Sequence, residues 1–253
     1  MISPTTIEMQ EGVSEDRDIR TVISRRSDLS TFVVHLTRDR NGEQAKEHLK
    51  SIVRSHKIEA RTAYGSAVKK LGNGNLALNS QKCVCFTETP LEYLHLLVGK
   101  INGRKCDFGP YGVAITKRLA RKTSVNPVWY VDITPGHDWL MNPINALIDC
   151  CNGNFQGSDV SKIAPFIEPM GTGNGGEYQP YRKEFWWERE WRHVGHFPLP
   201  SHVLVICPEG DFAEFESLAN QNSYSARCID STWGLEQIIA RLAGFDKQDV
   251  EIL

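Results

Sequence analysis

Two glutamates in an aromatic-rich segment are the residues of this chain best suited to carry chemistry. The segment spans residues 184–192 and reads EFWWEREWR. Aromatic and charged residues alternate there with the period of two typical of a β-strand, which predicts Glu188 and Glu190 on one face, about 6–7 Å apart. Carboxylates beside heavy aromatic residues on a sheet face are usually paired or functional. The segment therefore predicts either an acidic site or an amphipathic edge strand whose glutamates pair with Arg189 or Arg192.

Polar residues in two other predicted strands could join such a site. His35 and Thr37 lie two positions apart in the apolar segment 31–37, so they share a face and offer a hydrogen-bonding pair. Residues 86–90 read FTETP and end a second apolar strand, where their polar groups could line the mouth of a cleft. The alternatives are a histidine satisfied within the core and a plain N-cap of the next helix.

These side chains need a sheet to bring them together, and the rest of the chain predicts one. Short β-branched or aromatic runs indicate strands, and apolar residues three and four positions apart indicate helices. We expect strands at 31–37, 82–87, 111–116, 126–131, 202–207 and 226–229, with 58–63 extended. We expect helices at 43–55, after Pro90, over most of 137–168, and at 212–220 and 235–242. The irregular order favours an α+β fold over a doubly wound sheet.

Length and composition set the class of protein. The chain has 253 residues, 40% of them hydrophobic and 24% charged, as is usual for a soluble globular protein. No stretch approaches the roughly 18 apolar residues of a membrane span, and the polar N-terminus lacks the apolar core of a signal peptide. We therefore expect a cytoplasmic protein with no membrane partner, built as an N-terminal arm over 1–30 and a single domain over 31–253.

Cysteine and histidine spacing gives no metal motif. The seven cysteines are an odd set, so without a secretion signal we expect reduced thiols. His193 and His196 could form half of a zinc site, but no C-x-x-C motif accompanies them, and we expect no metal. The glycine-rich segment 171–176 precedes a predicted strand rather than a helix, so it is neither a dinucleotide fingerprint nor a P-loop.

Basic residues are unevenly distributed although the net charge is only −2. Residues 38–70 hold nine Lys or Arg against four Asp or Glu, and residues 100–122 hold seven against one. Such stretches can line a groove for phosphates, or they can be solvated helix faces.

A strand with a histidine, a strand ending in FTETP and a late Glu-x-Glu together resemble the ADP-ribosyltransferase superfamily. The resemblance implies a split mixed β-sheet core that clamps NAD, with surrounding helices and a substrate-contacting loop at 171–181. Glu190 would stabilise the positive charge that develops on the ribose, and Glu188 would position or deprotonate the acceptor. The residues implied to bind NAD are His35, Thr37, Arg38, Tyr64, Phe86, Thr87 and Tyr111, with Arg40 and Arg61 competing with Arg38 for the pyrophosphate.

A closer resemblance is to the AbiGi-like abortive-infection proteins of bacteria. It rests on V-x-F-x-x-x-P-L at 84–91, Tyr111-Gly112, N-P-V-x-Y at 126–130 and EREWR at 188–192, and it covers roughly residues 31–195. Members of this family are often labelled antitoxins. DNA-modifying DarT toxins and RNA 2′-phosphotransferases resemble the chain more distantly.

Three functions follow from these patterns. The main prediction is an enzyme: an NAD-dependent ADP-ribosyltransferase toxin of phage defence, acting on a nucleic acid, RNA in preference to DNA, and held by a cognate antitoxin. The alternative is a non-catalytic antitoxin or interaction module on a degenerate transferase fold. A metal-dependent nuclease using Glu188, Glu190 and His193 ranks last. The transferase prediction requires the acidic pair and His35 to meet at one cavity.

Overall fold

The structure is a computed structural model that describes residue 19 and residues 26–72, 76–102, 104, 106–151, 153–173, 181–223 and 225–245. Most of the predicted arm at 1–30 lies outside the described residues, as does the greater part of the predicted loop at 171–181. The division into an arm and one domain therefore stays a prediction.

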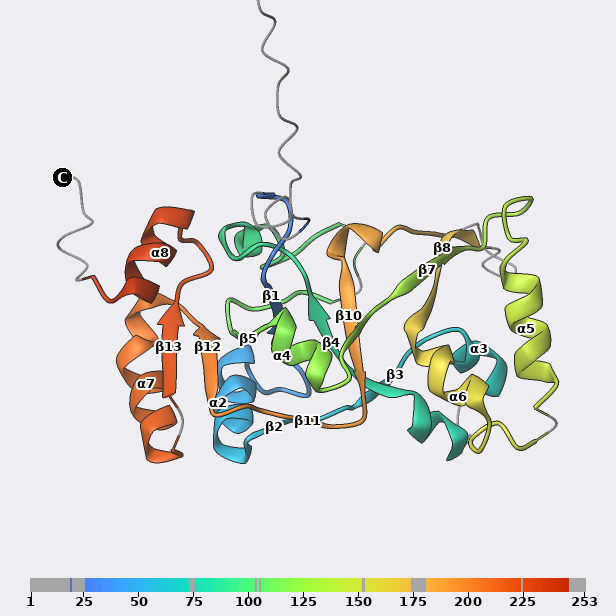
Figure 1. Cartoon of the computed structure of the whole chain (residues 1–253), viewed down its shortest axis with the longest axis horizontal. Coiled ribbons are helices and arrows are strands. Elements are labelled where there is room, and N and C mark those ends of the chain that lie inside the picture. Colours follow the sequence, from blue (N-terminus) through green and yellow to red (C-terminus); the bar gives the residue numbers. More distant parts are fainter. Residues whose placement is uncertain are drawn as a thin grey trace, which may run out of the picture.

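An eight-stranded mixed sheet forms the centre of the molecule (Figure 1). Its strands, in spatial order, are β13 (Ser225–Ile229), β12 (His202–Ile206), β5 (Gly112–Thr116), β1 (Phe32–Leu36), β4 (Lys82–Thr87), β10 (Glu190–Val194) and β6 (Asn126–Pro127), with β3 (Thr62–Ala63) also pairing with β4. Only β12 and β13 run parallel, and the other neighbours are antiparallel. The mixed sheet with surrounding helices confirms the predicted mixture of helices and strands.

Two smaller sheets accompany the main one. The first contains β7 (Trp129–Asp132), β8 (Ile167–Gly173) and β9 (Tyr181–Lys183), and the second pairs β2 (Lys57–Ile58) with β11 (Phe197–Pro198). Figure 1 places the three-stranded sheet at one end of the molecule, with α3 (Ala67–Leu71), α5 (Met141–Asp149) and α6 (Asp159–Ile163). The other end carries α7 (Phe212–Gln221) and α8 (Leu235–Ala243).

Alternating side chains of β1 explain how the main sheet is covered on both faces. Val33 belongs to a buried cluster that includes Leu49 of α2 (Ala45–Ser55) and Phe215 of α7. Val34 belongs to a second cluster with Leu94 of the 3₁₀ helix η2 (Leu91–Leu96) and Ile238 of α8. The remaining helical elements are α4 (Lys117–Lys122), η1 (Leu76–Gln81), η3 (Ala164–Phe166), η4 (Trp186–Glu188) and η5 (Glu209–Asp211). No helix in the described ranges is both long enough and apolar enough to cross a membrane.

The predicted strand over 184–192 is wrong in its first half. Residues 186–188 form the 3₁₀ helix η4, and Arg189 adopts a left-handed conformation with φ of 48°, so β10 begins only at Glu190. A left-handed residue reverses the extended path of the chain and ends the alternation on which the prediction depended. Glu188 and Glu190 therefore come from different elements.

The mostly helical prediction for 137–168 is confirmed over α5, α6 and η3, and it is wrong for the loop between α5 and α6 and for the start of β8. After α5 the chain makes a loop with Gly153 at φ of 83°, and Ser158 caps the short α6 by accepting a hydrogen bond from the Ser161 amide. Residues 167–173, which include the start of the predicted glycine-rich loop, then form β8. Apolar runs of this length do not distinguish a buried helix from a strand. The segment after Pro90 is likewise a 3₁₀ helix.

Candidate functional site

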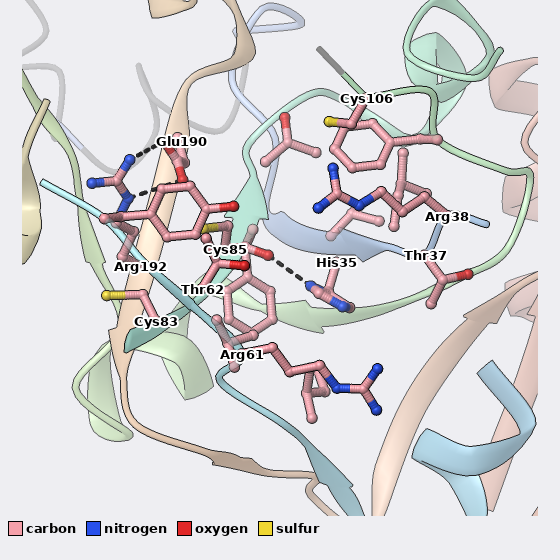
Figure 2. Close-up of a pocket in the computed structure, with 18 of the residues that line it drawn as sticks. His35, Thr37, Arg38, Arg61, Thr62, Cys83, Cys85, Cys106, Glu190 and Arg192 are labelled. Carbon is pink, nitrogen blue, oxygen red and sulfur yellow. Dashed lines mark hydrogen bonds and ion pairs between the residues drawn. The ribbon is translucent and has the colours of Figure 1, made fainter. Parts of the chain in front are cut away.

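One large cavity brings together most of the residues singled out in the sequence (Figure 2). It has a volume of about 990 Å³ and opens beside β1, β4 and the start of β10, with side chains of α2 along another wall. The predicted site residues that line it are His35, Thr37, Arg38, Tyr64, Phe86, Thr87, Glu188 and Glu190. Tyr111 is not among its lining residues: its hydroxyl donates to Asp211 Oδ2 at 2.8 Å.

Neighbouring strands explain why these residues meet. β4 lies between β1 and β10, and Thr87 registers with Val34 on one side and with Glu190 on the other. His35 is next along β1, and its Nδ1 lies 2.8 Å from the carbonyl oxygen of Cys85 on β4. Since a carbonyl oxygen only accepts, the proton sits on Nδ1 and Nε2 is left as an acceptor. Burial lowers the pKa of His35, so the imidazole is neutral.

Several predicted ligand-binding residues are engaged in holding the fold. The buried Thr37 hydroxyl donates to the Ala45 carbonyl oxygen at 2.8 Å, at the start of α2. Phe86 is buried and packs edge-on against Phe197, with ring centroids 5.2 Å apart. The Thr87 hydroxyl donates to the backbone carbonyl of Glu188 and thereby fixes η4 against the end of β4.

Glu190 is bound on both oxygens by a buried arginine. Arg192 donates from Nε to Oε1 at 2.9 Å and from Nη2 to Oε2 at 2.8 Å, a bidentate geometry that is among the stronger ion pairs. The two residues share a face of β10, and the Arg192 side chain is only 1% exposed. Arg192 also donates to Glu168 Oε2 at 2.6 Å and to the Pro165 carbonyl oxygen at 2.6 Å. Glu190 is therefore paired with Arg192, as one of the two alternatives from the sequence predicted.

Glu188 lies in a different environment. Its side chain is 20% exposed, and Arg104 Nη1 lies 4.0 Å from its Oε1. Burial, with a further contribution from the nearby charge of Glu190, raises the pKa of Glu188 to about 7. Arg104 and Lys183 oppose this shift without cancelling it.

Arg104 is a cavity residue that the sequence pattern missed. Its side chain is 3% exposed, its Nη2 donates to the carbonyls of Leu97 and Gly99 at 2.8 and 2.9 Å, and its guanidinium lies 4.7 Å from the Phe108 ring centroid. Nε and Nη1 have no hydrogen-bond partner among the described residues. The only sequence signal was its place in the basic stretch 100–122, which does not distinguish it from its neighbours.

His193, the histidine of the nuclease hypothesis, and His196, with which it could form half of a zinc site, both have a ring nitrogen close to a backbone group. His193 Nδ1 lies 3.3 Å from the Gly195 carbonyl oxygen, and His196 Nδ1 accepts from the Ala60 amide at 3.0 Å. Within the described ranges, no group of three or more His, Cys, Asp or Glu residues could hold a metal ion. The described residues thus provide no such ligand set for a divalent cation.

Comparison with known proteins assigns the chain to a family. A family model described as "Putative abortive phage resistance protein AbiGi, antitoxin" matches residues 50–222. No curated protein and no solved structure matches the chain. The antitoxin description overturns the main prediction: the chain is not assigned as an NAD-dependent ADP-ribosyltransferase toxin, nor as an enzyme. Because the match covers well over half of the sequence, this chain belongs to the AbiGi family of the abortive phage resistance systems.

Proposed function

We propose that this chain is the antitoxin of an abortive-infection pair and that it neutralises a cognate toxin by binding to it. The observation that carries the proposal is the match of residues 50–222 to a family described as an antitoxin. An antitoxin acts on a toxin, so the expected partner is a toxin protein. No comparison supports the nucleic-acid acceptor that the sequence had predicted.

The environment of Glu190 supports a function without a chemical step. A catalytic carboxylate must be free to meet charge that develops on a substrate. Glu190 instead has both oxygens occupied by Arg192, which is itself tied to Glu168 and Pro165. Moving Glu190 toward a substrate would leave a buried guanidinium partly unpaired, and that is energetically unfavourable. The acidic residue thus serves the packing of the fold.

The proposal includes a transferase-like ancestry for the fold. Its support is the meeting of His35, Thr87 and Glu190, from three adjacent strands, at one cavity. This was the geometric requirement of the transferase prediction, and an antitoxin on a degenerate transferase fold would retain it without the activity. The proposed antitoxin function does not depend on this ancestry.

Co-expression tests the proposed function. The toxin encoded beside this chain is expressed alone and together with it, and colony formation is measured. We expect toxin alone to stop growth, and this chain to restore growth and to co-purify with the toxin. Glu188→Gln should protect as well as the wild type, because neutralisation by binding needs no acid or base. Growth arrest by this chain alone, or a folded chain that neither protects nor binds the toxin, would contradict the proposal.

A further inference from the structure

The buried guanidinium of Arg104, a residue that lines the cavity, has unused hydrogen-bonding capacity. Arginine carries five N–H donors and keeps its charge in proteins, so burial is favourable only when the donors are paired. Two of its nitrogens, Nε and Nη1, have no partner among the described residues, and Arg104 is one of the residues that line the cavity. A buried polar group left in this state calls for an explanation, and a bound anion supplies one.

The charges around Arg104 favour an anion. Seven lysines or arginines line the cavity against four glutamates: Arg38, Arg40, Lys57, Arg61, Arg104, Lys183 and Arg192 against Glu59, Glu168, Glu188 and Glu190. Three of the glutamates are paired with other cations, which leaves only Glu188, at 4.0 Å, beside Arg104. Its pKa is raised to about 7, so near neutral pH it compensates the guanidinium incompletely.

Arg38 gives the cavity a second cation. No carboxylate lies within ion-pair distance of it in the described part of the chain, and its side chain is half-buried. Figure 2 shows its guanidinium extending across the cavity toward the side where Glu190 lies. Arg38 lies two residues beyond the end of β1, the strand that positions His35. Two guanidinium groups in one cavity are well matched to phosphate oxygens.

The remaining walls suit an uncharged planar group. Phe86, Phe108, Phe185 and Tyr64 contribute aromatic rings to the lining. His35 is neutral and presents Nε2 as an acceptor, and burial raises the pKa of Tyr64, which keeps its hydroxyl protonated. A volume of about 990 Å³ is far larger than inorganic phosphate requires and lies at the upper end of the range usual for small-molecule sites.

We propose that this cavity is a nucleotide-binding site, in which Arg104 and Arg38 bind the phosphates and the aromatic, neutral part holds the base and ribose. The proposal concerns binding without turnover, and it does not depend on the proposed antitoxin function. NAD, which the transferase resemblance suggested, is one member of the ligand class that this chemistry fits.

Calorimetric titration of the full chain tests the site. The probes are ADP and NAD, which both carry a diphosphate, together with adenosine and inorganic pyrophosphate as the separate halves. We expect saturable binding of at least one of the two nucleotides, with each half binding more weakly than the whole. Failure of both nucleotides to bind at millimolar concentration would overturn the proposal, and so would pyrophosphate binding as tightly as the nucleotides.

Arg104→Gln locates the binding site. Loss of charge-assisted hydrogen bonds to phosphate should weaken nucleotide affinity about tenfold to a hundredfold. Arg227→Gln is the matched control, because Arg227 also donates to two backbone carbonyls, those of Arg241 and Leu242, but does not line the cavity. A folded Arg104→Gln variant with wild-type affinity, and only a lower melting temperature, would assign Arg104 to holding its loop and refute the site.

Arg38→Gln is a second test of the nucleotide site, and it can be used even if the Arg104→Gln variant does not fold. Arg38 is half-buried and has no hydrogen bond or ion pair of its side chain to lose among the described residues, so its replacement should leave the melting temperature nearly unchanged. We expect its affinity for the nucleotide to fall about tenfold. Unchanged affinity in this variant would show that Arg38 does not bind the phosphates and would contradict the proposed mode of binding.

Discussion

Glu188 and Glu190 stand two positions apart, yet their surroundings give them different properties. Glu190 is fixed by two hydrogen bonds from Arg192, whereas Glu188 is held at the rim of the cavity with Arg104 at 4.0 Å. Burial and the charge of Glu190 raise the pKa of Glu188 to about 7, against the attraction of Arg104 and Lys183. Residue type and spacing alone cannot separate these two environments, because each depends on cations distant in the sequence.

Replacing Glu188 by glutamine should make stability less dependent on pH. With a folded pKa of about 7 against an ordinary value of 4.5, the folded state retains a proton that the unfolded chain has released. Stability from this group is therefore fully present at acid pH and is lost as the pH rises toward about 7. Glutamine resembles the protonated acid, so Glu188→Gln should match the wild type near pH 4.5 and exceed it at pH 8, by on the order of 2–3 kcal/mol.

Urea unfolding at the two pH values measures this difference. Glu236→Gln is the control, since Glu236 is an exposed glutamate on α8, and its replacement should change the free energy of unfolding equally at both pH values. An equal effect of Glu188→Gln at pH 4.5 and pH 8 would show that Glu188 does not titrate differently in the folded protein.

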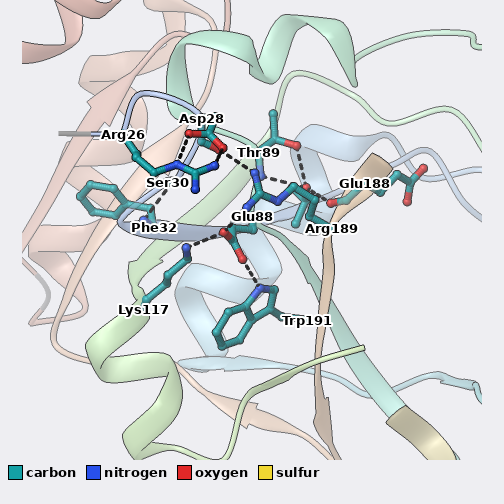
Figure 3. Close-up of polar contacts among 11 residues, drawn as sticks. Arg26, Asp28, Ser30, Phe32, Glu88, Thr89, Lys117, Glu188, Arg189 and Trp191 are labelled. Atoms are coloured by element: carbon teal, nitrogen blue, oxygen red, sulfur yellow. Dashed lines mark hydrogen bonds and ion pairs between the residues drawn. The ribbon is translucent and has the colours of Figure 1, made fainter. Parts of the chain in front are cut away.

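The junction between β4 and β10 is held by a polar cluster around Glu88, on elements that are distant in sequence (Figure 3). The Glu88 carboxylate is buried and accepts from Trp191 Nε1 at 2.7 Å, and it pairs with Arg189 at 2.8 Å and with Lys117 of α4 at 2.6 Å. Arg189 also donates to the Asp28 carbonyl oxygen. The cluster thus fastens β4, α4, the turn before β10 and the segment that precedes β1.

Glu88→Gln should destabilise the fold by about 2 kcal/mol. The amide can still accept from Trp191, but the charges of Lys117 and Arg189 lose their partner. Removing one member of a buried ion pair costs about 3–5 kcal/mol, and the effect is smaller here because both cations are partly exposed. Glu216→Gln is the matched control, because its pair with Arg241 is one-third exposed and should contribute less than about 1 kcal/mol. Equal losses of unfolding free energy in chemical denaturation would contradict a special role for Glu88.

Local sequence patterns predict the elements in which apolar residues recur at regular spacing. The apolar run 82–87 coincides with β4, and the apolar spacing of 43–55 predicts α2 to within two residues. Patterning fails where one residue redirects the chain, as Arg189 does before β10. It also fails to single out Arg104, because burial of that side chain depends on carbonyls of a turn and on Phe108, which no periodicity reveals.

At the scale of the whole molecule, Arg192 joins the main sheet to the three-stranded sheet. It belongs to β10, but it donates to Glu168 of β8 and to Pro165 of η3. The backbone at Gly65 also packs closely against the backbone at Ala164. The φ of Gly65 is +97°, and a Cβ at this position would lie 2.0 Å from the Ala164 carbonyl oxygen. The three-stranded sheet has its own buried cluster, which includes Val131, Met141, Ile144, Ile148 and Ile167. The sequence predicted strands and helices here, but not this joint, because its contacts are specific and distant in sequence.

Glu168→Gln should loosen this joint without unfolding the main sheet. Burial tends to raise the pKa of Glu168, but Arg192 and Lys183 lower it below its ordinary value, so the carboxylate is charged and paired. Glutamine removes that charge and leaves Arg192 held by Glu190 and Pro165. We expect faster amide hydrogen exchange in β7, β8 and α5, unchanged exchange in β12 and β13, and a loss of about 1–3 kcal/mol in unfolding free energy.

Asp159→Asn is the comparison for this last variant, because it removes a carboxylate from the same end of the molecule. Asp159 pairs with Lys162 on α6 at an almost fully exposed position, so its replacement should leave exchange in β7 and β8 unchanged. The two variants thus separate the loss of one negative charge from the loss of the Arg192 contact. Faster exchange throughout the main sheet in Glu168→Gln would mean that both sheets open as one cooperative unit, and the joint would then not be a separate element of stability.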